Sequence, residues 1–554
     1  MATTERPIWT SLPARIVMTI VVIGILAALM IPTGGPGPGE IVKPPTDPTV
    51  PVETGCTRDL QRILGGMSPG RLGINTGSDD LAVELNRWFA KCGEDIEEEL
   101  TNDAELQKEY FSPELYQALQ EERFLPSDIE HVRMSLLAKQ IVENVSGEIE
   151  KESDKVVALF EFVSNHIILL DTQNSTISDL PATPYESLVW GLGSVEHRAW
   201  TFATLLRQIR IDAFIVIPQS QPDMWLIGVH VPEVGVQLFE PRLGLPIPSL
   251  PDSPVTSSSP VATLSSVKED NAPLTQFAVN DFQYPLTKDE LKEVSIKLIG
   301  SPSLWANRIA KLQYMISPLD GVQLYDGIGP NALRSEGAQR ERIIELGKQK
   351  NLWDESQVEV WQYPLEQIAA FASAQQSSNH NLMTFEAIFA GPQLLKVDSL
   401  TGQAVEDVVT GAPVYAAAKT TLHAVRIEQL LGQHQEALPH FGPILTSYKT
   451  NPSPLNEEAA TFAALWIGIS QMGTNRLTAA ENSFDRFTST FRQSQTQLVP
   501  IDLLQVNAYR WKAIVQLKQG GMVDAVETLK ASQATQPSQR DAWLIQRWEK
   551  QLSK

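Results

Sequence analysis

Hydroxyl, imidazole and carboxylate side chains occur together in one stretch of the chain, between residues 190 and 245. Ser194, His197, His230 and Glu240 are residue types from which enzymes build a nucleophile, a base and an orienting acid. Their spacing does not favour this chemistry. His197 is expected on a helix, pointing away from the start of that helix, and His230 on a strand, facing the side opposite to the residue that precedes the strand. A serine-based catalytic site is therefore the weaker interpretation.

The residues around Ser194 also follow a longer pattern. A helix start, Gly193-Ser-Val195-x3-Ala199-x5-Leu205-Leu206-Arg207, is followed by Ile211-Asp-Ala213 and by a strand that ends in Phe239-Glu240-Pro241. This pattern resembles the core of the transglutaminase-like superfamily, papain-type thiol enzymes and their relatives, over residues 150 to 250. In that family a cysteine thiolate at the helix start is the nucleophile, a strand histidine moves the proton, and an aspartate orients the histidine.

The three positions that would carry this reaction hold other residues here. The resemblance places Val195 at the cysteine position, Trp225 near the histidine position and Glu240 at the aspartate position. Valine has no nucleophilic atom, and tryptophan has no base of useful pKa. The resemblance therefore implies a non-catalytic descendant of the fold. The alternative is a divergent transglutaminase-like peptidase or acyltransferase that acts on peptide substrates.

Such a fold could keep a ligand-binding cleft after losing the reaction. Arg198, Trp200, Trp225 and Arg242 are expected around it, where they would offer charged and aromatic contacts to a peptide or a glycan. The alternative is a purely scaffolding role, with Val195 simply packing its helix into the core.

The N-terminal part of the chain indicates a membrane anchor and export. Residues 16–31 are uncharged and apolar, and as a helix they would extend about 24 Å, close to the thickness of a membrane core. Arg6 and Arg15 precede this segment, so residues 1–15 are expected in the cytoplasm and the bulk of the chain outside it. A single-pass signal anchor is favoured, with a cleaved signal peptide as the alternative. Residues 32–55 are rich in proline and glycine, which is typical of a linker.

Cys56 and Cys92 are the only cysteines of the chain. In an oxidising compartment they are expected to form a disulfide, and two unpaired thiols are the alternative. Two cysteines are too few for a zinc cluster of thiolates.

Composition and missing motifs exclude several classes of function. The 554 residues include 66 acidic and 44 basic ones, a net charge of −22, without the basic block that a nucleic-acid-binding protein needs. The chain carries no P-loop and no dinucleotide-binding fingerprint. His434 and His440, six residues apart, have the wrong spacing for one helix face. No cofactor and no metal site is therefore expected.

A faint repeat marks the C-terminal part, residues 411–554. The pattern Gly432-x4-Ala437-x3-Phe441 recurs as Asn475-x4-Ala480-x3-Phe484 and as Gly520-x4-Ala525-x3-Leu529. Glycine or asparagine suits the turn of a helical hairpin, and the small alanine lets the paired helix approach. This resembles the tetratricopeptide repeat family, although the offsets, 475 − 432 = 43 and 520 − 475 = 45, exceed the family's roughly 34 residues. The resemblance implies protein partners; an ordinary helical bundle is the alternative.

The sequence thus predicts a multi-domain α+β protein. Its parts are an N-terminal membrane anchor helix, an acidic helical region (56–150), a transglutaminase-like, papain-like α+β domain (151–250), a mixed α+β region (265–400) and a C-terminal domain of tetratricopeptide-like α-helical repeats (411–554). In the mixed region, strands are expected at Val294–Leu298, Val322–Tyr325 and Val358–Trp361. The expected function is a membrane-anchored, exported, non-catalytic adaptor or scaffold that binds proteins in the cell envelope.

Overall fold

A computed structural model describes most of the chain from residue 55 onward. It covers residues 55–69, 77–93, 108, 111, 113–170, 180–249, 260–316, 321–327, 338–391, 393–395, 415–417, 421–490 and 498–554. The expected anchor at 16–31, its flank 1–15 and nearly all of the linker 32–55 lie outside these residues. Within the covered ranges, no helix combines the length and the apolar character that crossing a bilayer requires.

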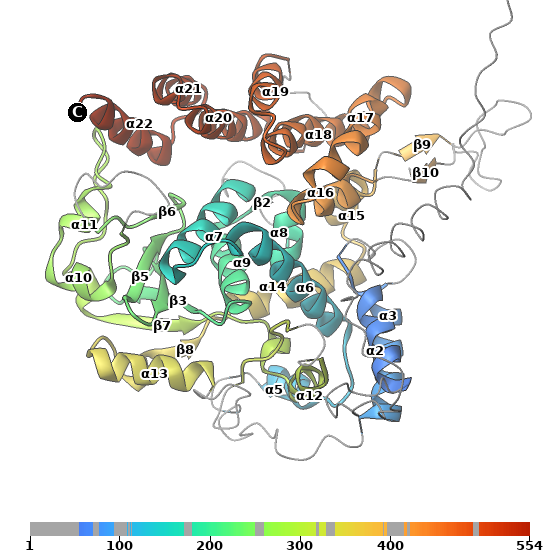
Figure 1. Cartoon of the computed structure of the whole chain (residues 1–554). Helices are drawn as coiled ribbons and strands as arrows, with labels where there is room; N and C mark the ends of the chain where they lie inside the picture. The colour runs from blue at the N-terminus through green and yellow to red at the C-terminus, as the bar shows by residue number, and fades with distance from the viewer. Residues whose placement is uncertain are drawn as a thin grey trace, which may run out of the picture. The chain divides into compact units, whose positions relative to one another are not determined.

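A six-stranded sheet lies at the centre of a mixed α+β fold, with strand order β6-β5-β4-β3-β7-β8 (Figure 1). All neighbouring strands are antiparallel except β7 and β8, which are parallel. The strands are β3 (Asp212–Pro218), β4 (Leu226–Val231), β5 (Gly235–Glu240), β6 (Leu245–Pro246), β7 (Val294–Leu298) and β8 (Val358–Val360). Because β7 and β8 extend the same sheet as β3 to β5, the mixed region 265–400 is joined to the region before it.

Both faces of this sheet are buried, as the alternation along β3 shows. Ala213 and Ile215 belong to one hydrophobic cluster, whereas Phe214 and Val216 belong to another. Helices that contribute to the first cluster are α6 (Pro126–Ser146), α7 (Glu152–His166), α8 (Pro184–Trp190) and α9 (Val195–Arg207), beside the short strands β1 (Ile168–Leu169) and β2 (Leu192–Gly193). Helices that contribute to the second are α10 (Leu264–Glu269), α11 (Ala272–Thr275) and α13 (Gln339–Lys350).

The strand expected at Val322–Tyr325 does not form. This segment is buried but has no regular secondary structure, and a side chain takes the place of a neighbouring strand. The amide of Gln313, on α12 (Asn307–Ile316), donates to the carbonyl of Val322 at 2.8 Å and accepts from the backbone N–H groups of Leu324 and Tyr325. The strand prediction is therefore wrong here, because Gln313 satisfies the backbone groups of this buried segment.

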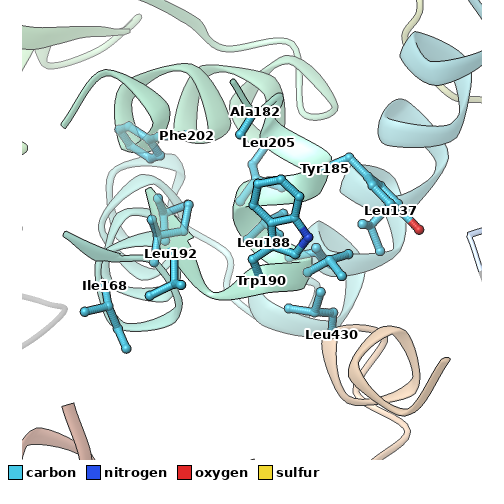
Figure 2. Close-up of a cluster of buried hydrophobic side chains, with 14 of the residues drawn as sticks. Leu137, Ile168, Ala182, Tyr185, Leu188, Trp190, Leu192, Phe202, Leu205 and Leu430 are labelled. Atoms are coloured by element: carbon cyan, nitrogen blue, oxygen red, sulfur yellow. The ribbon is translucent and has the colours of Figure 1, made fainter. Parts of the chain in front are cut away.

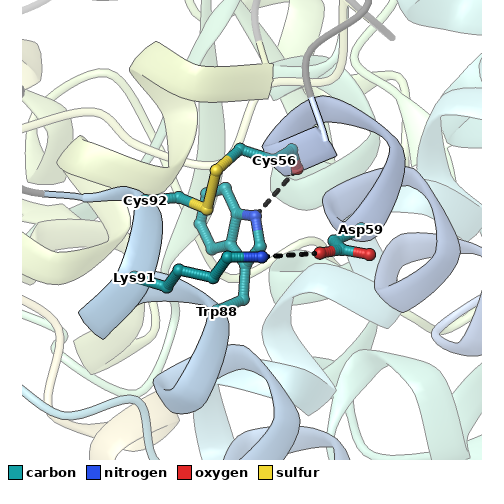
Figure 3. The surroundings of a disulfide bond; sticks show 5 residues. All are labelled: Cys56, Asp59, Trp88, Lys91 and Cys92. Carbon is teal, nitrogen blue, oxygen red and sulfur yellow. Dashed lines mark hydrogen bonds and ion pairs between the residues drawn. A yellow bond between two sulfur atoms is a disulfide. The ribbon is translucent and has the colours of Figure 1, made fainter.

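The acidic N-terminal region is helical where it is described. Its helices are α2 (Gly55–Gly66), α3 (Ser78–Cys92), α5 (Pro113–Gln120) and α6. A disulfide between Cys56 and Cys92 holds α2 against α3 (Figure 3). Beside it, the indole N–H of Trp88 donates to the carbonyl of Cys56 at 2.8 Å, and Lys91 pairs with Asp59.

The C-terminal part is an array of helical hairpins. It consists of α16 (Leu422–Leu430), α17 (His434–Thr450), α18 (Pro454–Gly473), α19 (Leu477–Thr490), α20 (Ile501–Lys518), α21 (Met522–Thr535) and α22 (Gln539–Leu552). The three residues expected at hairpin turns all have left-handed backbones, with φ of 73° at Gly432, 57° at Asn475 and 83° at Gly520. The alanines and aromatic or leucine residues of the repeated pattern are all buried. Each pattern therefore builds the same helix–turn–helix unit.

The inner side of the array lies against the rest of the fold. Asn507 of α20 and Arg540 of α22 both hydrogen-bond to Asn165 at the end of α7. Arg426 of α16 donates to the carbonyl of Leu188 in α8 at 3.1 Å, and Leu430 of α16 packs in the cluster that includes Leu188 and Trp190 (Figure 2). In Figure 1 the second helices of the hairpins, α17, α19 and α21, lie on the side of the array away from the sheet. The first helices are thus used for packing within the chain.

The hydrophobic clusters do not follow the expected domain borders. One cluster contains residues from Met134 in α6 to Val515 in α20, which crosses the borders at 150, 250 and 411. Two helices of the middle part of the chain also contribute to this cluster, α14 (Tyr363–Gln376) and α15 (His380–Phe389). They are followed by a pair of antiparallel strands, β9 (Gln393–Leu395) and β10 (Tyr415–Ala417). Residues 55–554 accordingly form one compact unit.

Candidate functional site

Ser194 caps helix α9 instead of presenting a reactive hydroxyl. Its Oγ accepts a hydrogen bond from the backbone N–H of His197 at 3.3 Å and is bonded to the hydroxyl of Tyr363 at 3.0 Å. This is the normal role of serine at a helix start. Val195, at the expected nucleophile position, follows as the first residue of α9 and packs partly buried against the surrounding core.

His197 has both ring nitrogens occupied. The backbone N–H of Ser194 donates to Nδ1 at 3.0 Å, and Nε2 donates to the carbonyl of Ala182 at 3.0 Å. The ring is 5% exposed, and burial lowers its pKa to about 4. With its basic nitrogen already accepting a backbone hydrogen bond, this imidazole is not positioned to take a proton from Ser194.

His230 lies at the opposite end of β4 from Trp225. It sits near the end of β4, in register with Asp212 on β3 and Val236 on β5. Trp225 immediately precedes β4, so the two positions are separated by about 16 Å along the strand. The serine-based alternative therefore finds no base among the histidines considered for it.

Trp225 and Glu240 do lie at the same end of the sheet. The pairing of Ile227 with Phe239 brings the start of β4 beside the end of β5. Arg242 joins them: its Nη1 donates to the carbonyl of Trp225 at 2.8 Å and to Oε1 of Glu240 at 3.1 Å, and its guanidinium lies 5.0 Å from the centre of the Trp225 ring. Arg242 thus links Trp225 and Glu240 at this end of the sheet.

Glu240 is fully enclosed and has a different partner from a catalytic aspartate. Its side chain is 0% exposed. Besides Arg242, the hydroxyl of Tyr284 donates to it. The Glu240 carboxylate is therefore paired with a guanidinium and a phenol, and not with an imidazole.

An aromatic stack fills the space between the start of α9 and Trp225. The ring centres of Trp225 and Trp361 are 5.8 Å apart, and Trp361 is stacked on Tyr363 with ring centres 5.2 Å apart. Tyr363 in turn reaches Ser194 and His197 through its hydroxyl. The side chains of Trp361 and Tyr363 thus connect Trp225 with Ser194 and His197.

Three of the four residues expected to line a cleft are buried. Arg198 is 2% exposed and donates to the carbonyls of Ser164, Ile167 and Pro241. Trp200 is 3% exposed and belongs to the cluster that the array shares. Neither side chain can reach a ligand in this arrangement. Trp225 is 9% exposed and belongs to the same cluster, and Arg242, which is partly exposed, is bonded to its carbonyl.

The cavity beside Ser194 is very small. It measures about 20 Å³ and is lined by Gly193, Ser194, His197 and apolar side chains, among them Trp190 and Phe385. This volume admits about one water molecule, which excludes a peptide or a glycan.

A much larger groove, of about 1030 Å³, opens on the other side of the aromatic stack. Residues of β8 line it together with Trp361 and Tyr363. This groove and the aromatic pair were not predicted from the sequence. A signal was present: the strand expected at Val358–Trp361 ends on one aromatic residue, and Tyr363 follows two positions later. Their meaning depended on knowing which strand lies beside β8.

Within the covered ranges, no three histidine, cysteine, aspartate or glutamate side chains are grouped as metal ligands. Comparisons with protein-family models, curated proteins and solved structures found no match to this chain.

Proposed function

We propose that this chain is a non-catalytic, transglutaminase-like scaffold of the cell envelope, anchored to the membrane through residues 16–31, that binds protein partners. The observation that supports it best is the state of the three reaction positions. Val195 packs into the core, Trp225 supplies an indole and a backbone carbonyl, and Glu240 is paired with Arg242. Acyl transfer needs a nucleophile and a base at these positions, and none is available.

The helical array supports the binding role. Its first helices are fixed on the rest of the fold, which makes the array rigid and leaves the second helices, α17 and α19, facing away from the sheet (Figure 1). Stacked helical hairpins form extended surfaces that suit protein recognition. The net charge of −22 favours selective, soluble association over binding to polyanions.

Reactive probes test the non-catalytic part. The purified full-length chain is treated with a fluorophosphonate, which labels activated serines, and with iodoacetamide, which labels free thiols. We expect no labelling under non-reducing conditions, because Cys56 and Cys92 are joined in a disulfide. Labelling that the Ser194→Ala substitution removes would show a serine enzyme and would refute the proposal.

Site-specific crosslinking tests the binding part. A photoreactive amino acid is placed at Thr446 on α17 or Arg486 on α19, both exposed on the outer helices, and at the exposed Val234 between β4 and β5 as a control. In intact cells we expect the two outer positions to crosslink to the same protein and Val234 not to do so. Crosslinks from neither outer position would contradict partner binding by the array.

A further inference from the structure

The groove beside β8 has the size and the mixed lining of a site for a small ligand. Its volume is about 1030 Å³. Sites for small molecules commonly measure about 300–1,000 Å³ and combine apolar surface with a few polar groups. The buried residues Val358 and Val360 line the groove together with two aromatic residues, Trp361 and Tyr363, and with exposed polar side chains. The groove therefore suits a ligand that is itself partly apolar and partly polar.

The charges at the groove are balanced. Three basic and three acidic side chains line it or pair with its lining residues: Lys297, Arg340, Lys348, Glu355, Glu359 and Glu366. Within the covered ranges, ion pairs join all of these except Glu366. Because the charges cancel, the groove has no net field that would select a cation or an anion. A neutral ligand fits this lining best.

Three exposed polar side chains of the lining have hydrogen-bonding capacity left for a ligand. Among the residues that the structure describes, the hydroxyl of Ser356 and the carboxylate of Glu366 have no hydrogen-bond partner. The amide nitrogen of Gln362 donates to the carbonyl of Val360 at 3.4 Å, which leaves its oxygen to accept. A serine or glutamine side chain can donate and accept, whereas a carboxylate accepts. This set suits the hydroxyl groups of a ligand, since a hydroxyl can also donate and accept.

The aromatic pair offers apolar surface beside these polar groups. Trp361 and Tyr363 both line the groove and are only partly buried. Their ring centres are 5.2 Å apart, with 25° between the ring planes. Carbon atoms in direct contact are about 3.5–4.0 Å apart, so the two rings are offset and neither ring covers the other completely. A flat apolar face of a ligand could pack there while its polar edge bonds to Gln362 and Glu366.

We propose that this groove binds a neutral, β-linked saccharide of the glucose type. Such a sugar ring carries its hydroxyl groups around the edge and has C–H groups on both faces, so it combines the two properties that the lining requires. A glucose ring and an N-acetylglucosamine ring share this shape, and the experiment distinguishes them. The inference goes beyond the proposed function and does not depend on it, because it adds a glycan to the protein partners of the scaffold.

Calorimetric titration of the full-length chain tests the inference. The probes are cellotetraose and chitotetraose, which are neutral tetrasaccharides of β-linked glucose and of β-linked N-acetylglucosamine. Sorbitol at the same concentration of hydroxyl groups is the control, since it has hydroxyl groups but no ring. We expect at least one tetrasaccharide to bind and sorbitol not to bind. Absence of binding by both tetrasaccharides, or equal binding by sorbitol, would overturn the assignment.

A pair of glutamine variants locates the site on the protein. Gln362→Ala removes an exposed amide of the lining and should weaken binding of the tetrasaccharide about two- to tenfold, the usual range for one hydrogen bond. Gln435→Ala makes the same change at an exposed position of α17 and should leave binding unchanged. Equal effects of the two variants would place binding outside the groove and would overturn the inference.

A pair of aromatic variants tests the packing of the sugar ring. Trp361→Ala should weaken binding about tenfold, because it removes aromatic surface from the groove. Tyr314→Ala, at a tyrosine of α12 that is 59% exposed, is the control and should not change binding. Undiminished binding by a folded Trp361→Ala variant would refute ring packing. If Trp361→Ala fails to fold, the double variant Gln362→Ala with Glu366→Gln, at two exposed positions, still decides, since it should bind more weakly than Gln362→Ala alone.

The outcomes separate this inference from the proposed function. Absence of binding by both tetrasaccharides would overturn the groove assignment alone, because the reactive probes and the crosslinks from α17 and α19 do not involve the groove. Release of shorter saccharides from a tetrasaccharide, seen by mass spectrometry, would instead contradict the non-catalytic scaffold.

Discussion

The guanidinium of Arg242 lies 3.1 Å from the carboxylate of Glu240, and the two form an ion pair at the end of β5. Glu240 is fully buried, whereas the side chain of Arg242 is 26% exposed. Glu240, which the sequence pattern aligned with an orienting acid, thus has a guanidinium as its partner. The energetic role of this pair can be measured.

Removing the positive partner should destabilise the fold. Arg242→Met would leave the buried carboxylate with Tyr284 as its remaining side-chain partner, so we expect the free energy of unfolding to fall by about 2–3 kcal/mol. Urea denaturation measures this change. The double variant Arg242→Met with Glu240→Gln should lose less free energy of unfolding than the two single variants lose together. Arg62→Met, which breaks the exposed pair of Arg62 with Glu84, should cost under about 0.5 kcal/mol. Equal costs for Arg62→Met and Arg242→Met would contradict the importance of burial.

Glu458 should make stability depend on pH. Burial in α18 raises its pKa to about 7, although the N–H groups of Leu498 and Val499 donate to it. The folded state therefore holds the proton more tightly than the unfolded state, whose pKa is about 4.5. The contribution of Glu458 to stability is full below pH 4.5 and is lost as the pH rises to about 7.

The measurement compares urea midpoints of the wild type and Glu458→Gln from pH 4.5 to 8. As the pH rises over this range, the free energy of unfolding of the variant should increase by about 2–3 kcal/mol relative to that of the wild type, because glutamine carries no charge to bury. Glu436→Gln, at an exposed position, should follow the wild type. A constant difference between Glu458→Gln and the wild type at all pH values would show that Glu458 does not titrate in this range.

The hairpin turns of the array should respond to alanine in a graded way. Gly520 has φ of 83° and open space where the methyl group of an alanine would extend, so Gly520→Ala should cost about 1 kcal/mol from backbone strain alone. Gly432 has φ of 73°, and a methyl group there would lie 3.1 Å from the side chain of Asn144. Gly432→Ala should therefore cost more than Gly520→Ala.

Gly65, in helix α2, serves as the control for these turns. It has open space and no left-handed backbone, so Gly65→Ala should be neutral or stabilise the fold by about 0.5 kcal/mol. Chemical denaturation ranks the three variants. A loss in Gly65→Ala as large as that in Gly520→Ala would argue against backbone strain as the cause.

Reduction of the disulfide should release α2. Cys56 and Cys92 are separated by 36 residues in the sequence. In the chain-entropy model, closing a loop of this size lowers the entropy of the unfolded chain and so stabilises the fold by about 3–4 kcal/mol. The variant Cys56→Ser with Cys92→Ser should therefore be cleaved by a protease within residues 55–92 faster than the wild type. Addition of a reductant should accelerate cleavage of the wild type and leave the double variant unchanged. An identical cleavage rate for reduced and oxidised wild type would contradict this role.

Local features of the fold could be read from the sequence because they depend on neighbouring residues. Gly432, Asn475 and Gly520 mark turns because only some residues accept a left-handed backbone cheaply. Two of the three strands expected between residues 265 and 400 form for a similar reason, since alternating burial is a local pattern. The absence of a nucleophilic atom at Val195 also follows from the sequence alone, because it depends only on the residue type.

Tertiary structure decided everything that depends on distant residues. Tyr363 reaches Ser194 across 169 positions of the chain, and Arg426 reaches Leu188 across 238. No periodicity of either segment encodes such a contact, because it arises only when several elements pack on one sheet. The same packing buried Arg198 and Trp200, which the sequence placed around a cleft. The residue types were thus determined by the sequence alone, while their access to a ligand was determined by the packing of the whole chain.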